Sequence, residues 1–446
     1  MITYSIINKS QLEGNLRLDA EYYRPEYLEL IENINNLGAV PIRNMVANPK
    51  RKFKPQKDKV FQYIEISEVD LSTGEYNKRE ILGRYTPDRA QWIVRQNDVI
   101  ISTVRPIRNA VSLIKEDIEN LVCSSGFAIL KPEKIEPEYL FIYLKSKPIV
   151  ELLDRMTTAT MYPAITVEDI LKTKIYLGNQ KFRNEIKNEV LEAEKETEKS
   201  KSFYSQAENL LLEELGLKDF KVEDDLFYVV NLSNVKSAHR TDAEYFQPKY
   251  RLIEKKLIKD FKAKKIRDFN FIEITTGQYS EEYIEAALGK PYIRGTDLSG
   301  TITVKLDNLV YIDSKKQLSS KKAKCGDVVV TRVGTVGISA RLPKEVEGGT
   351  ISDNLIRLSF PEERLNSYYV SLFLNSIGSQ FMIRESRGSV QSRLNQETLK
   401  EIVLPVLPKA TQQKIADLVR KSHEARKKAK ELLEEAKTKV EKLIEK

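Results

Sequence analysis

Hydrophobic residues recur with helical spacing in two long, charged segments of the chain. They follow one another alternately four and three residues apart from Ile186 to Leu211, and again from Ile415 to Val440. This spacing is the heptad pattern of coiled-coil helices. Because the middle of each seam is polar, a pair of surface helices packed on their own domains is the alternative. The predicted seam residues are Ile186, Val190, Ala193, Tyr204, Leu211, Ile415, Val419, Ala429, Leu433 and Val440.

A region of mixed pattern precedes each long segment. Short β-branched and apolar runs bounded by turn residues predict strands at 98–103, 174–177, 327–331 and 402–408. Apolar stripes with helical spacing predict helices at 138–154 and 367–385. Strands and helices interspersed in this way indicate a mixed α/β (α+β) fold.

The two halves of the chain repeat one another. Residues 18–27 read LDAEYYRPEY and residues 241–250 read TDAEYFQPKY, an offset of 223. Further along, NDV at 97–99 matches GDV at 326–328, and the offset settles near 229. Such self-similarity indicates a duplication with one fold in both halves. Asp19 and Asp242 are predicted to cap opening helices that end near Leu37 and Ile258.

The repeat predicts four successive segments. Globular domains are expected at 1–180 and 216–408, and the long helices at 181–215 and 409–446. If the helices pair, the connections require an antiparallel pair with the globular domains at opposite ends. About 35 residues at about 1.5 Å per residue give a spacer of roughly 50 Å. We therefore expect a dumbbell with pseudo-two-fold symmetry.

Composition narrows the class of protein. The 446 residues contain no apolar run long enough for a transmembrane helix, and the N-terminus has no signal-peptide pattern, so a cytoplasmic location is expected. Two cysteines and two histidines are too few for a zinc site and make histidine-based catalysis improbable. The net charge of +8 favours an anionic partner, although 65 acidic residues make the charge mixed.

In its repeated segments and long helices, the chain resembles the specificity subunit of type I restriction-modification systems over nearly all of its length. The resemblance is carried by the paired openings, by NDVIISTVRP and GDVVVTRVGTVG, and by TTATMYPAITVEDI and SRGSVQSRLNQETLKEI before the long helices. LPKATQQKI at 407–415 matches the family's Pro and Gln before the helix, whereas LGNQKFRNEI at 177–186 lacks the proline.

The resemblance implies a non-catalytic subunit with two target-recognition domains, each of which reads one half of an asymmetric, split DNA sequence. The paired helices would set the gap between the half-sites, whose centres would lie more than one DNA turn apart. The expected partners are double-stranded DNA, two modification (methyltransferase) subunits and the restriction (translocase-nuclease) subunits. No cofactor is expected on this chain, and S-adenosylmethionine, ATP and magnesium are expected on the partners. The outer helix faces and the paired openings are candidate docking surfaces.

Residue chemistry suggests where DNA would bind. Lys and Arg suit phosphates, and Arg and Gln held on loops suit base edges. Arg105, Arg108 and Arg332 follow buried-looking strands, and the resemblance places the loops at 157–162 and 387–393 on the DNA side. The candidate residues are Lys50, Arg51, Lys52, Arg105, Arg108, Thr158, Thr160, Tyr162, Lys315, Lys316, Lys321, Lys322, Arg332, Arg387, Ser389, Gln391 and Arg393. No catalytic residue and no metal ligand is predicted.

Other functions are weighed against this hypothesis. A stand-alone DNA methyltransferase would need an NPPY-like motif and a glycine-rich loop for S-adenosylmethionine, and the sequence has neither. The carboxylate cluster of a nuclease is also missing: Pro87-Asp88 is followed by no [DE]-x-K within thirty residues. Two alternatives stay open. One is the target-recognition subunit of a related split-site methyltransferase-nuclease, and the other is a coiled-coil adaptor that does not bind DNA.

Overall fold

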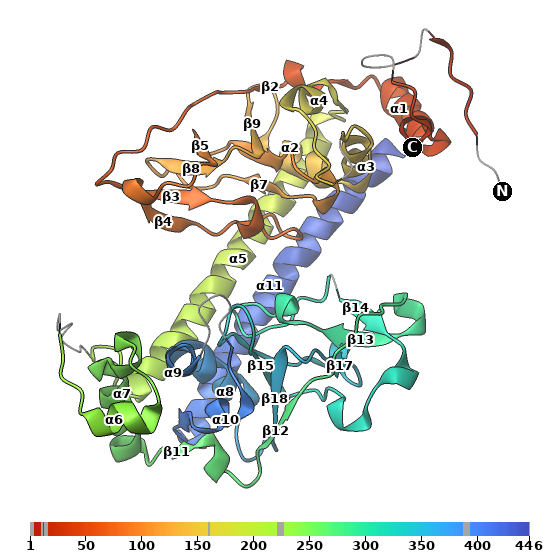
Figure 1. The fold of residues 1–446 in the computed structure, drawn as a ribbon. Coiled ribbons are helices and arrows are strands. Elements are labelled where there is room, and N and C mark those ends of the chain that lie inside the picture. Colours follow the sequence, from red (N-terminus) through yellow and green to blue (C-terminus); the bar gives the residue numbers. More distant parts are fainter. Residues whose placement is uncertain are drawn as a thin grey trace. The chain divides into compact units, whose positions relative to one another are not determined.

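The chain forms two compact units in a computed structural model (Figure 1). The structure describes residues 4–9, 12, 17–158, 161–220, 227–307, 309–386 and 393–445. Unit 1 is Met1–Glu198 with Arg426–Lys446, and unit 2 is Lys199–Ala425. Each unit therefore combines one globular region with part of both long helices, whereas the linear division into four segments stays a prediction. No helix among the described residues has the length and apolar character needed to cross a membrane.

Unit 1 consists of short helices and strands that precede a long helix. Its helices are α1 (Pro25–Asn36), α2 (Pro137–Lys145), α3 (Lys147–Arg155), α4 (Val167–Lys172) and the first part of α5 (Gln180–Glu214). Its strands are β1 (Val40–Pro41), β2 (Val46–Ala47), β3 (Val60–Ile64), β4 (Arg79–Leu82), β5 (Ala90–Ile93), β6 (Val99–Ser102), β7 (Val111–Leu113), β8 (Leu121–Ser124), β9 (Phe127–Pro132) and β10 (Lys174–Ile175). The single helix predicted at 138–154 is wrong, because the chain is extended at Ser146, two residues before Pro148, and α3 starts afresh.

Unit 2 has a similar succession of elements, although no strand among its described residues takes the place of β5. Its helices are α6 (Leu232–Ala238), α7 (Pro248–Phe261), α8 (Ser367–Phe373), α9 (Ser379–Glu385), α10 (Gln396–Lys400) and the start of α11 (Lys409–Ile444), and a π-helical turn, η14 (Leu374–Gly378), joins α8 to α9. Its strands are β11 (Lys264–Lys265), β12 (Glu273–Thr276), β13 (Lys290–Ile293), β14 (Val310–Ile312), β15 (Val328–Thr331), β16 (Ser339–Arg341), β17 (Thr350–Ile351), β18 (Leu355–Ser359) and β19 (Val403–Leu404).

The sheets of the two units follow one plan. Unit 1 has sheets of order β2-β9-β6-β7 and β4-β3-β8-β5, and unit 2 has β12-β18-β15-β16 and β14-β13-β17. The pairs β3–β8 and β13–β17 are parallel, and the other pairs in these sheets are antiparallel. Where unit 1 has β5, unit 2 has only a bridge between Lys322 and Thr350. A mixed α/β fold is thus present in each unit.

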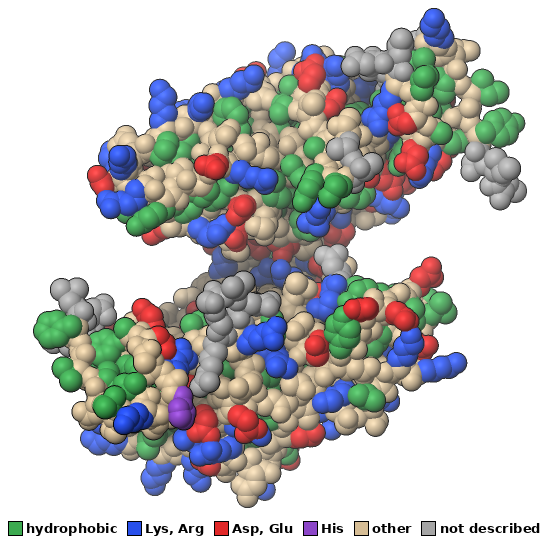
Figure 2. Space-filling view, viewed as in Figure 1, with side chains coloured by type: hydrophobic (Ala, Val, Ile, Leu, Met, Phe, Trp, Pro, Cys, Tyr) green, Lys and Arg blue, Asp and Glu red, His purple; other side chains and the backbone are tan. Residues whose placement is uncertain are grey.

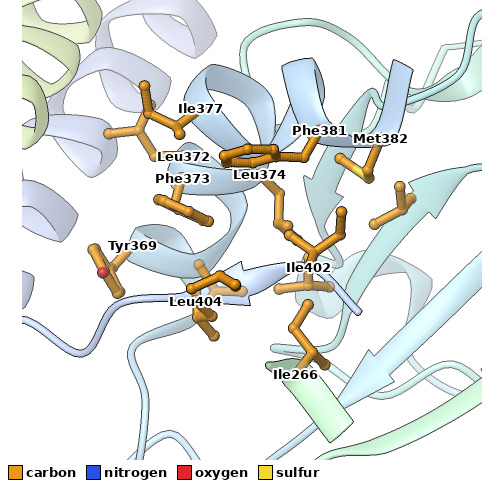
Figure 3. Packing of buried hydrophobic residues seen from close by; sticks show 14 of the residues in the cluster. Ile266, Tyr369, Leu372, Phe373, Leu374, Ile377, Phe381, Met382, Ile402 and Leu404 are labelled. Carbon is orange, nitrogen blue, oxygen red and sulfur yellow. The ribbon is translucent and has the colours of Figure 1, made fainter. Parts of the chain in front are cut away.

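The central strands are apolar on both faces, and the core explains why. In unit 1, Val99 and Ile101 of β6 belong to the cluster that contains α2, whereas Ile100 belongs to a second cluster with the other sheet. In unit 2, Val330 of β15 belongs to the cluster that contains α8, and Val329 belongs to a second cluster with the other sheet. Alternate side chains of a strand point to opposite faces, so a strand buried on both sides needs a continuous apolar run. Figure 3 shows the first of these clusters in unit 2, where side chains of α8, α9 and β19 interdigitate.

The long helices run antiparallel within each unit. In unit 1, Lys439 Nζ lies 2.6 Å from Glu185 Oε1 and Lys428 Nζ lies 2.8 Å from Glu196 Oε1. In unit 2, the hydroxyls of Ser200 and Ser422 lie 3.0 Å apart in a buried contact. All predicted seam residues except the half-buried Tyr204 are buried, and their clusters also contain the sheet and α2 or α8. The seams therefore pack on the globular core as well as along the helix pair.

Arg426 is a polar position in the middle of the second predicted heptad seam, and its side chain contacts a loop of unit 1. Arg426 of α11 lies 3.9 Å from Asp70 and 3.7 Å from Glu75, in the turn before β4. Its guanidinium therefore holds a loop of unit 1.

A buried glutamine explains the Pro-and-Gln motif before α11. Gln412 Nε2 donates to the carbonyl of Leu407 at 2.8 Å, and its Oε1 accepts from the amide of Asn366 at 2.9 Å. The matching position in the first copy is Arg183, whose Nε lies 2.9 Å from Glu136 Oε2. At this position, unit 1 therefore has an ion pair where unit 2 has the hydrogen bonds of a buried carboxamide.

The predicted capping of the opening helices by Asp19 and Asp242 is wrong. Neither carboxylate caps a helix, and α1 and α7 begin at their prolines after a short 3-10 turn. Proline fits the first helical position, and it disfavours helical geometry in the residue before it. The two carboxylates instead accept hydrogen bonds from Arg17 and Arg240, which lower the pKa of each.

The tyrosine that the two openings share, Tyr22 in unit 1 and Tyr245 in unit 2, lies against two guanidiniums. Arg155 and Arg17 lie 3.7 and 4.4 Å from the centroid of the Tyr22 ring. In unit 2, Arg384 and Arg240 lie 4.4 and 4.6 Å from the ring of Tyr245. Cation–π contacts at these distances bind the opening segment to its own unit.

Candidate nucleic-acid interface

A rigid loop follows β6 in unit 1. Arg105 and Asn109, which flank the short 3-10 turn η6 (Pro106–Arg108), both have left-handed backbone angles, with φ of 50° and 58°. Such angles are costly for residues other than glycine and persist only where the surroundings hold them. Here Asn109 Nδ2 donates to the carbonyl of Lys145 at 2.9 Å, and the exposed Arg108 lies on the turn. The fold thus holds two predicted arginines on a fixed loop.

A second loop attaches to the first. The amide of Arg105 donates to the carbonyl of Pro163 at 2.7 Å, and the amide of Ile165 donates to the carbonyl of Thr103 at 2.9 Å. The guanidinium of Arg105 lies 5.5 Å from the centroid of the exposed Tyr162 ring. Thr158 pairs with Ala164 in the same loop, and Thr160 lies outside the described residues. The structure therefore brings Arg105, Thr158 and Tyr162 together.

A third segment at the same end of the sheet was not predicted. The amide of Thr103 donates to the carbonyl of Gly126, in the turn between β8 and β9, at 2.8 Å. Ser125 of this turn donates its amide to the carbonyl of Arg89 at 2.7 Å, and Arg89 is exposed. The only sequence signal for Arg89 was a cation directly before a strand, which is common on protein surfaces.

The predicted cluster at Lys50–Lys52 lies elsewhere. Arg51 forms a two-pronged ion pair with Asp98, with N–O distances of 2.6 and 3.2 Å, and the side chain of Asp98 is only 2% exposed. Asp98 directly precedes β6, whereas Arg105 follows its other end, so the strand separates the two groups. Lys50 and Lys52 are exposed. Arg51 has a partner inside the protein, which sequence alone did not reveal.

Unit 2 repeats the loop arrangement with different side chains. Val333 pairs with Arg393, as Val104 pairs with Ala164 at positions 229 lower. The amide of Leu394 donates to the carbonyl of Arg332 at 2.8 Å, which repeats the bond between Ile165 and Thr103. Arg332 and the exposed Arg393 are thus neighbours. The predicted residues Arg387, Ser389 and Gln391 lie outside the described residues.

The predicted lysines of unit 2 lie close to this loop cluster. Gln278 donates from Nε2 to the carbonyl of Lys316 at 2.7 Å, and its backbone pairs with Ser352 in the turn between β17 and β18. Lys321 Nζ donates to the carbonyl of Thr276 at 2.7 Å, and Lys316 forms an ion pair with Glu282. Lys315 and Lys322 are exposed.

The charges at these loops suit DNA contacts. Arg332 donates to the carbonyl of Asp353 at 3.3 Å, and its buried Nε has no hydrogen-bond partner among the described residues. On the face seen in Figure 2, Lys and Arg side chains are interspersed with acidic ones over both units. A mixed surface with arginines concentrated at fixed loops can bind phosphates and base edges at defined positions. In the described part of the chain, no three His, Cys, Asp or Glu side chains are arranged as metal ligands.

Comparisons with known proteins find sequences similar to parts of the chain. The family model of the type I restriction modification DNA specificity domain matches residues 258–436. The type I restriction enzyme HindI specificity subunit of Haemophilus influenzae is 22% identical over 104 residues, which are 22% of this chain and 23% of that protein. The chain thus spans about a quarter of the length of this curated relative.

Solved structures are similar at low sequence identity. The HsdS subunit from Thermoanaerobacter tengcongensis is 19% identical with a TM-score of 0.33, and the match covers 89% of this chain and 95% of that one. The type I restriction-modification S subunit from M. genitalium is 12% identical with a TM-score of 0.41, and the match covers 91% and 94%.

Proposed function

We propose that the chain is the DNA specificity subunit of a type I restriction-modification enzyme, a proposal supported by the match of residues 258–436 to the family model of the type I restriction modification DNA specificity domain. Each unit reads one half of an asymmetric, split DNA site. The observation that carries this proposal is the loop cluster built twice on the same backbone hydrogen bonds but with different side chains. Two units with the same backbone but different DNA-contacting side chains suit two unlike half-sites, whereas identical side chains in both units would select a palindrome.

The loop clusters supply the contacts in this proposal. Arg105 and Tyr162 in unit 1, and Arg332 and Arg393 in unit 2, would approach base edges, because a fixed guanidinium can bind guanine in a bidentate manner. The exposed Lys315 and Lys322 would anchor phosphates. This division of roles makes the loop arginines determinants of sequence and the lysines determinants of affinity.

The long helices set the distance between half-sites in this proposal. The ion pairs and the serine contact described above are consistent with an antiparallel pair. A helix advances about 1.5 Å per residue and DNA about 3.4 Å per base pair. Insertion of seven residues in each helix would therefore lengthen the preferred gap by about three base pairs.

Catalysis belongs to partner chains in this proposal. Two modification subunits would supply methyl transfer with S-adenosylmethionine, and restriction subunits would use ATP and magnesium. The curated relative is by name the specificity subunit of a restriction enzyme. The outer helix faces are the proposed docking surface, because the inner faces are buried in the core clusters.

The test uses the full chain in complex with a type I modification (methyltransferase) subunit from the same host. Random-sequence DNA is methylated in vitro, and the methylated molecules are sequenced. The proposal expects one motif of two unlike parts separated by a fixed gap. Methylation without sequence preference, or binding that non-specific DNA competes away fully in a gel shift, would contradict it.

A further inference from the structure

A three-residue turn joins β17 to β18 in unit 2, at the centre of the loop cluster. The amide of Asn354 donates to Ser352 Oγ at 3.2 Å, and the carbonyl of Asn354 accepts from the amide of Arg332 at 3.1 Å. The amide of Asp353 donates to the carbonyl of Gln278 at 3.2 Å, and Arg332 donates to the carbonyl of Asp353. One hydrogen bond within the turn and three to the segments of Gln278 and Arg332 thus fix the backbone of this turn.

The side chain of Asn354 is unused by the fold. It is exposed, and its carboxamide makes no hydrogen bond among the described residues. The nearby carboxamide of Gln278 differs, because its Nε2 donates to Lys316 and its Oε1 accepts from the amide of Leu318 at 3.0 Å. One carboxamide therefore holds the scaffold together, and the other extends from it with both polar atoms available.

The same turn in unit 1 carries no such side chain. There the amide of Gly126 donates to Ser124 Oγ at 3.3 Å and its carbonyl accepts from Thr103, so Gly126 takes the place of Asn354. A Cβ added to Gly126 would lie 2.6 Å from Cδ1 of Ile66. The position 229 residues after Ile66 is Gly295, where an added Cβ would lie 3.7 Å from Thr331. Unit 2 thus has a glycine at the position of the isoleucine that would meet a side chain at Gly126 in unit 1.

From this geometry we propose that Asn354 is a specificity-determining residue that recognises adenine in the half-site read by unit 2. The carboxamide offers one donor and one acceptor side by side, which match N7 and the N6 amino group of adenine in the major groove. A fixed backbone removes the entropy cost of ordering the loop on DNA. The neighbouring guanidiniums of Arg332 and Arg393 supply the positive charge that draws the DNA to this turn. The inference rests on the proposed function of the chain.

The experiment compares three variants with the wild type in the complex with the methyltransferase. Asn354→Ala removes the carboxamide, and Asn354→Asp keeps its shape but removes the donor. Asn270→Ala is the matched control, because Asn270 is an exposed asparagine before β12, at the end of that strand away from the turn. Each complex methylates random-sequence DNA, and the preference at every position is read from the methylated molecules.

Both Asn354 variants are expected to lose about 10-fold to 100-fold of the preference at a single adenine in one half-site, with the other half and the gap unchanged. Asn270→Ala should reproduce the wild-type motif. A wild-type motif that persists in both Asn354 variants overturns the inference, as does an equal loss at all sequences, which indicates a structural role. A loss at a G·C pair overturns the assignment to adenine. If the wild type itself yields no two-part motif, the proposed function has failed instead.

Discussion

Substitution of Arg51 distinguishes two roles for this residue of the basic segment before β3. In one role it stabilises unit 1 through an ion pair, and in the other it contacts a DNA phosphate. Its ion pair with the 2% exposed Asp98 is two-pronged, and the Arg51 side chain is itself only 19% exposed. Arg51→Ala would leave a buried carboxylate without its cation, a change that costs about 3 to 5 kcal/mol in such pairs. Because Asp98 retains one hydrogen bond from the amide of Arg95 at 2.8 Å, we expect the lower limit, about 3 kcal/mol.

The single tryptophan of the chain makes this effect measurable in unit 1. Trp92 on β5 pairs with Lys52, one residue from Arg51, so its fluorescence follows the unfolding of this unit. With a slope of about 2 kcal/mol per molar urea, the midpoint of Arg51→Ala should fall by about 1.5 M. The adjacent and exposed Lys52→Ala should leave it within about 0.3 M. An unchanged midpoint in Arg51→Ala, together with weaker DNA binding and a salt dependence shallower by about one unit, would refute the structural role and identify a phosphate contact.

Further substitutions test other parts of the structure. Burial lowers the pKa of Lys145 to about 7, so below this pH the folded unit carries a buried ammonium. As the pH rises from 7 towards the unfolded pKa of about 10.4, the wild type should gain about 2 kcal/mol by pH 9, and Lys145→Met should lose this gain in urea titrations followed by Trp92. Gln412→Ala should destabilise unit 2 by about 1 to 3 kcal/mol and accelerate hydrogen exchange at the amide of Asn366, and unchanged exchange would contradict the role of Gln412. Arg105→Ala and Arg393→Ala should each relax one half-site in sequenced methylation products, whereas a uniform loss would indicate phosphate anchoring.

The elements that the sequence predicted well are those with a strong period. The heptad seams predicted the long helices, which run at Gln180–Glu214 and Lys409–Ile444, and the apolar runs predicted β6 and β15 to within a residue or two. Burial on both faces makes these strands continuously apolar, so their pattern survives in the sequence.

The features that sequence reasoning missed depend on contacts between distant segments. Arg51 appeared to belong to a lysine-rich surface loop, because its partner Asp98 lies 47 residues away. From the sequence, only the missing proline in the first copy of the Pro-and-Gln motif was apparent, and the ion pair of Arg183 with Glu136 became visible in the structure. Asn354 resembles any surface asparagine, and its position in a fixed turn beside Arg332 is visible only in three dimensions.

The central claim is that one chain reads two unlike half-sites. Sequencing of every methylated position in the genome of the host, with and without the gene for this chain, tests it most directly. The account predicts one asymmetric two-part motif with a fixed gap that disappears with the gene. A palindromic or contiguous motif, or methylation that is unchanged without the chain, would contradict it.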